Sequence, residues 1–215
     1  MKATFLSRQI MGITALGTLQ VLLPTVAGRP DPTAAQCLTR DLKWSAGGAC
    51  LIALGAVWLA PLALVGAAAY AWPLARLMAH AWRAWRHEIV APGNAMPLLA
   101  AAMAGLALAL GHGMLHAFGM AAGAHDIPLF IVAFLLPLVS GAAGQLLPVW
   151  LRPGVQEAWH RQSRQRLAWG ARGRGALLVA GGVLTALGYA LGYGLALLCA
   201  LWLALAMLAV LFRAR

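Results

Sequence analysis

Five long apolar runs, separated by short polar connections, make up most of this chain and limit what it can fold into. About 20 consecutive apolar residues allow one helix to cross the hydrocarbon core of a bilayer. A soluble domain carries charged side chains at about a quarter of its positions, whereas this chain is 10% charged and 62% hydrophobic. The sequence therefore predicts an all-α integral membrane protein, a polytopic helix bundle. The five runs cover residues 9–27, 45–79, 97–120, 128–151 and 175–212.

The second and fifth runs are longer than one crossing requires. Each contains residues that favour a break, at Ala60-Pro61 and around Gly192-Tyr193-Gly194, because proline and glycine interrupt a regular helix. Each run is therefore either one protruding helix or a tight pair of helices. The first interpretation gives five membrane spans and the second gives seven.

The distribution of cations favours seven spans. Fourteen of the sixteen Lys and Arg residues would then face one side, in the connections 28–44, 80–96 and 152–174, at Arg76 just before the second of them, and in the C-terminal segment. Cytoplasmic loops of membrane proteins are rich in such residues. We expect about seven transmembrane helices in one domain, residues 1–215, in a bacterial inner (cytoplasmic) membrane with the C-terminus in the cytoplasm. Because the cations lie in connections and not on an amphipathic face, the sequence does not favour a nucleic-acid partner.

An internal repeat runs through the chain with an offset of about 124 residues. Residues 17–24 read GTLQVLLP and residues 141–148 read GAAGQLLP. Such repeats are typical of polytopic membrane proteins built by duplication. The sequence thus predicts two unequal repeats, at about 9–80 and 97–212.

The first apolar run allows two further hypotheses. Lys2 and Arg8 precede it and residues 26–28 read VAG, so a secretory signal peptide is an alternative to a span. In addition, the run 97–120 precedes the motif of the second repeat, and the first repeat contains no equivalent. Either the first repeat is naturally short or a further helix lies upstream.

His112 and His116 are the ionisable residues that stand out within the apolar runs. Ionisable side chains inside a bilayer are costly and are therefore candidate functional residues. The two histidines are four positions apart, so they share a helix face, and Met120 would extend that stripe by one turn. Three interpretations remain open: haem ligation by an imidazole nitrogen, a copper or zinc site that adds Met120 and His125, and two neutral histidines that bond between helices.

Geometry limits the haem interpretation. Two histidines one turn apart on one helix cannot bind opposite faces of a single porphyrin, so at most one of them ligates the iron. The other axial ligand must be a methionine, water, a gas or a residue from elsewhere. A further helix or a partner subunit is its natural source.

Other chemistry is weakly represented. The sequence contains no phosphate-binding loop, no paired carboxylates and no serine elbow. It therefore predicts no specific catalytic activity, and any enzymatic role would be related to that of oxidoreductases. Cys37, Cys50 and Cys199 are widely spaced and are expected to be apolar filler. The basic, tryptophan-containing segments 79–88 and 158–166 are expected at the lipid headgroups.

The two repeats carry a resemblance to a known family. The helix ending LGTLQVLLPTVAGR, followed by a short connection and a Gly/Ala/Leu-rich hairpin, is similar to NnrS-type membrane proteins at the margin of the haem-copper oxidase superfamily. The second copy, FLLPLVSGAAGQLLPVWLRP, resembles the same unit. The resemblance implies b-type haem, with copper as a lesser alternative, in the outer half of the helices. Only His112 and His116 carry over, and the HxH pair of true oxidases is missing from this sequence.

The sequence thus predicts a haem-associated inner-membrane protein with a redox or nitric-oxide-response role. We expect lipid around it, with a homo-oligomer or a respiratory complex as its protein partner. The alternatives are a cofactor-free small transporter or permease-like subunit, and an assembly or structural partner of a respiratory complex.

Overall fold

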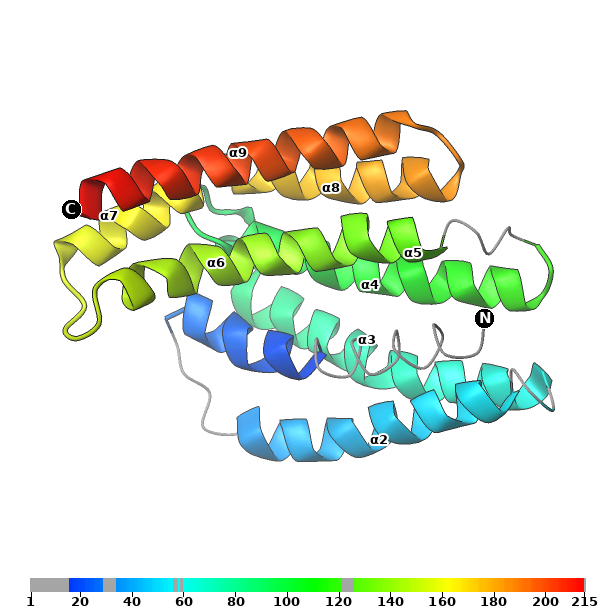
Figure 1. Cartoon of the computed structure of the whole chain (residues 1–215). Helices are drawn as coiled ribbons and strands as arrows, with labels where there is room; N and C mark the ends of the chain where they lie inside the picture. The colour runs from blue at the N-terminus through cyan, green and yellow to red at the C-terminus, as the bar shows by residue number, and fades with distance from the viewer. Residues whose placement is uncertain (1–15, 29–33, 56–57, 59, 121–125, 215) are drawn as a thin grey trace. The chain divides into compact units, whose positions relative to one another are not determined.

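The computed structural model describes residues 16–28, 34–55, 58, 60–120 and 126–214, and most of these residues lie in helices joined by short turns and connections. No strand occurs among these residues, which confirms the predicted all-α class (Figure 1). The elements are the helix Leu16–Val26, α2 (Ala34–Gly55), α3 (Ala60–Val90), α4 (Met96–Ala117), α5 (Asp126–Leu129), the π-helix η2 (Phe130–Leu135), α6 (Leu136–Leu151), α7 (Ala158–Leu167), α8 (Ala171–Ala186) and α9 (Leu191–Ala214).

Four of the described helices are long and apolar enough to cross a membrane, which supports the prediction of a membrane protein. In α9 only 17% of the most apolar window is buried within the chain, so its apolar surface is left for lipid to cover. The other helices are too short or carry too many charges to qualify by length and composition. The four are Pro61–Val90, Met96–His116, Asp126–Leu151 and Leu191–Arg213.

The chain divides into two compact units. The first comprises Met1–Ala84 and Leu106–Gly123, and the second comprises Trp85–Gly105 and Ala124–Arg215. Helices α3 and α4 each contribute to both units. In α3 the division falls at Trp85, whose φ of −131° and ψ of 22° interrupt the helical backbone.

The first unit is built around the pair α2–α3, which replaces the single long run predicted as residues 45–79. Helix α2 ends at Gly55 and α3 begins at Ala60, so the break predicted at Ala60-Pro61 is confirmed. The two backbones approach closely, since a Cβ on Gly48 would lie 2.7 Å from the carbonyl oxygen of Gly66. Small residues allow this approach between helices.

The second unit contains the corresponding pair α8–α9. Its break lies at residues 187–190 and not at the predicted Gly192-Tyr193-Gly194. Gly188, with a φ of +84°, ends α8, because glycine adopts left-handed backbone without strain. Gly192 serves a different purpose inside α9, where a Cβ would lie 2.8 Å from the backbone nitrogen of Thr185.

The π-helix η2 lies at the centre of the second unit. A Cβ on Gly105 of α4 would overlap the carbonyl oxygen of Ala133, and one on Gly182 of α8 would lie 2.5 Å from the Ala133 Cβ. Pro137 follows in α6 and lacks the N–H that would bond the Ala133 carbonyl in an α-helix. A wider turn accommodates the proline ring, and three helices meet at Ala133.

Candidate functional site

The candidate histidines lie in the last two turns of α4, in the part that belongs to the first unit. His112 is half-buried and His116 is exposed. Their spacing of four residues within a continuous helix places them one turn apart on one face, as predicted. A half-buried imidazole on an apolar helix would offer one ring nitrogen as a candidate ligand.

Met120 does not extend the histidine stripe as a helical residue. Helix α4 ends at Ala117, and Gly119 then reverses the chain with a φ of +71°. The Met120 backbone N–H donates to the carbonyl of Leu115, and its side chain is 74% exposed. The spacing of His112, His116 and Met120 did not predict this turn, because a glycine at position 119 is also compatible with a longer helix.

The described residues contain no group of three or more His, Cys, Asp or Glu side chains that would hold a metal ion. His125, the other ligand considered for copper, lies outside the described residues. Among the described residues, α4 offers the side chains of His112 and His116 on one face as candidate ligands. The haem interpretation requires only one imidazole from this helix.

A second polar site, centred on Asp41, was missing from the sequence analysis. Gln20 Nε2 donates a hydrogen bond of 2.8 Å to Asp41 Oδ2. Arg76 Nη1 lies 3.3 Å and Arg40 Nε 3.5 Å from Asp41 Oδ1. The Asp41 side chain is only 4% exposed, so three segments of the first unit meet at one buried carboxylate.

A small cavity of about 10 Å³ adjoins this carboxylate. Its polar lining consists of Gln20, Asp41 and Ser45, and Leu16, Gly17, Leu38 and Leu42 complete it. The Oε1 atom of Gln20 and the hydroxyl of Ser45 are buried and have no hydrogen-bond partner among the described residues. A cavity of this size holds about one water molecule. Two guanidinium groups beside one carboxylate leave no excess negative charge to attract a cation.

One feature of the sequence indicates this site. Asp41, Ser45 and Gly48 follow each other at spacings of four and three residues, so they share one face of α2. The predicted connection 28–44 includes Asp41, between the cations Arg40 and Lys43. In the structure α2 begins at Ala34, so Arg40, Asp41 and Lys43 are all helical residues.

Other residues singled out in the sequence are distributed as follows. Cys199 is buried, Cys37 is half-buried and Cys50 is exposed, and all three are free thiols. Gln145, in the motif at 141–148, is half-buried in α6, whereas Gln20, in the motif at 17–24, is buried. A largely apolar cavity of about 140 Å³ lies between α6, α8 and α9 beside Cys199.

Comparison with known proteins adds no assignment. No family model, no curated protein and no solved structure matches this chain. The functional argument therefore depends on the residues themselves.

Proposed function

We propose that this chain is a multi-pass protein of the bacterial inner membrane that binds b-type haem through His112, in a redox or nitric-oxide-response role. The observation that carries the proposal is the position of His112, half-buried in one of the four helices suited to crossing a membrane. An ionisable residue retained in such a helix is a functional candidate. His116, one turn further on, is the supporting residue.

We also propose seven spans with the C-terminus in the cytoplasm. Two observations support this topology. Each of the two long apolar runs consists of two helices, α2–α3 and α8–α9. The cations then collect on one side of the membrane, as they do in cytoplasmic loops generally.

In this proposal His112 binds the iron through one ring nitrogen, and the haem, when bound, supplies electron transfer or gas binding. The protein's part is to hold the imidazole in an apolar helix and to limit access of water. His116 lies on the same helix face as His112, so it would support the site and would not bind the same haem together with His112. Any second protein ligand would come from another segment or from a partner in a larger assembly.

Visible absorption of the protein purified from haem-replete cells tests the proposal. We expect a Soret band that is lost in His112→Ala and retained in the matched variant Met114→Ala, a half-buried neighbour on the same helix. Colourless protein from such cells would contradict haem binding. Elemental analysis of the same sample then tests copper or zinc.

The Asp41 site favours a second candidate, a cofactor-free permease-like subunit. A carboxylate that pairs with an arginine inside a helical membrane protein is typical of substrate and proton pathways. Proteoliposomes loaded with a pH-sensitive dye would report proton movement. In this candidate, Asp41→Asn abolishes the flux, whereas Gln36→Ala on the exposed face of the same helix leaves it unchanged. An assembly role would show neither absorbance nor flux.

A further inference from the structure

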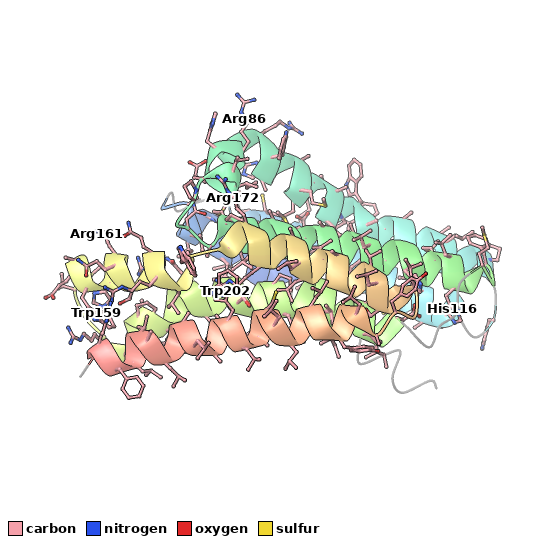
Figure 2. All side chains as sticks on the ribbon, turned by 90° about the horizontal axis from the view of Figure 1, so that it is seen from above. Arg86, His116, Trp159, Arg161, Arg172 and Trp202 are labelled. Atoms are coloured by element: carbon pink, nitrogen blue, oxygen red, sulfur yellow. The ribbon has the colours of Figure 1, made fainter. Side chains whose placement is uncertain are left out.

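Helix α7 exposes two arginines on the outside of the second unit, at the two edges of an exposed side that also carries Gln162 and Gln165, and we call this side the basic face. Its buried side carries His160, Ser163 and Leu167, whereas Arg161 and Arg166 are exposed. Arg172, on the first turn of α8, is exposed as well. In Figure 2 Arg161 and Arg172 project on the same side of this unit.

The N-terminal end of α7 is fixed by a closed hydrogen-bond arrangement. His160 Nδ1 accepts a 3.0 Å bond from the Glu157 backbone N–H, and the Glu157 side chain accepts from the His160 backbone N–H. His160 Nε2 donates to the carbonyl of Arg152 at 2.8 Å. The arrangement is a capping box that satisfies the free donors of the first turn, and it also ties down the connection that precedes α7.

The C-terminal end of α7 is fixed by a buried cation. Arg174 is 1% exposed and donates from Nη2 to the carbonyl of Leu167. A positive charge near a helix C-terminus also stabilises the helix, because it interacts favourably with the negative end of the helix dipole. Leu167 itself is fully buried, and Gly170, with a φ of +68°, turns the chain into α8. The basic face is therefore held in place at both ends.

Little on this surface neutralises the arginines. Between residues 152 and 174 the chain has six arginines and one acid, Glu157, whose side chain is used in the capping box. Arg152 lies over the ring of Trp159, whereas neither of the two salt bridges at Asp41 involves Arg161, Arg166 or Arg172. Trp150 and Trp169 flank this surface and are 72% and 69% exposed. Exposed tryptophans next to arginines are typical of the membrane–water interface.

We propose that Arg161, Arg166 and Arg172 form a preorganised binding surface for the phosphate headgroups of anionic phospholipids. The apolar helices that adjoin it and the flanking tryptophans favour lipid over a nucleic acid, which would need a hydrophilic approach to the same arginines. The inference rests on the membrane insertion proposed above, but it does not depend on haem.

Lipid selectivity in nanodiscs tests the proposal on the full chain. The protein is reconstituted with equal amounts of phosphatidylglycerol and phosphatidylcholine, and the lipids that remain bound are quantified by native mass spectrometry. We expect enrichment of phosphatidylglycerol that falls about tenfold in the triple variant Arg161→Gln/Arg166→Gln/Arg172→Gln. The matched control Gln162→Ala/Gln165→Ala alters the exposed side of the same helix without changing its charge and should keep the enrichment.

Two further measurements address preorganisation and the source of the phosphate. His160→Ala keeps every arginine but frees the start of α7, so the enrichment should fall severalfold, and His160→Gln should restore part of it. Excess inorganic phosphate or a short RNA should compete poorly with the lipid. Equal enrichment in the triple variant and the control, an unchanged His160→Ala, or full competition by phosphate or RNA would overturn the proposal. Recovery of each variant in nanodiscs confirms insertion separately.

Discussion

Gln20 Nε2 donates a hydrogen bond of 2.8 Å to Asp41 Oδ2, and the two residues are 21 positions apart in the chain. The bond links the helix Leu16–Val26 to α2, and Arg76 brings α3 to the same carboxylate. Apolar surfaces of membrane helices have little preference for each other over lipid tails, so interhelical hydrogen bonds help to determine which helices pair. The packing of the first unit is expected to depend on this contact.

Asp41→Ala should lower the stability of the protein. It leaves the buried Gln20 amide without its hydrogen-bond acceptor, which costs about 1–3 kcal/mol, and it removes the ion-pair partner of Arg76. Thermal unfolding in detergent measures the change, with Gln36→Ala as the control on an exposed position of the same helix. Equal melting temperatures for the two variants would show that the network does not stabilise the unit.

Two glycines of α4 should respond in opposite ways to alanine. Gly105 touches the backbone of Ala133, where a Cβ has no room, whereas nothing lies within 4 Å of a Cβ on Gly113. Gly105→Ala should destabilise the protein by about 1–3 kcal/mol. Gly113→Ala should stabilise it by about 0.5–1 kcal/mol, because alanine favours the helix. Unfolding in denaturing detergent compares the two, and a stable Gly105→Ala would contradict the close packing at η2.

His160→Ala should loosen the start of α7 without unfolding the chain. The substitution removes both hydrogen bonds of the ring, to the Arg152 carbonyl and from the Glu157 N–H, at a cost of about 1–3 kcal/mol. Hydrogen–deuterium exchange should become faster for the amides of residues 157–164. His87→Ala, at an exposed position near the end of α3, serves as the control and should leave that exchange unchanged.

Cysteine labelling should place α7 in the cytoplasm. In a variant without the three native cysteines, Gln162→Cys should react with an impermeant maleimide only after the membrane is opened. Met120→Cys, at a position that is 74% exposed, should react in intact spheroplasts. Labelling of Gln162→Cys from outside would reverse the proposed orientation. Reaction of both positions from one side would eliminate the seven-span topology.

The sequence by itself determined the all-α class of the protein and the division of one long apolar run into α2 and α3, whereas the break between α8 and α9 lies a few residues before the predicted glycines. Long apolar runs in lipid form helices because a helix satisfies the backbone hydrogen bonds within the segment. Proline and glycine interrupt such a helix, and the run at 45–79 is divided between α2 and α3. The same reasoning located His112 and His116 on one face, since helical spacing is a local property.

Tertiary structure decided which polar groups meet. Asp41 reads as part of a charged connection until α2 extends back to Ala34 and the helix Leu16–Val26 presents Gln20 to it. Arg174 reads as one more surface cation until the turn at Gly170 directs it to the carbonyl end of α7. Both outcomes depend on contacts between distant segments, whose geometry no local pattern of apolar and charged residues encodes.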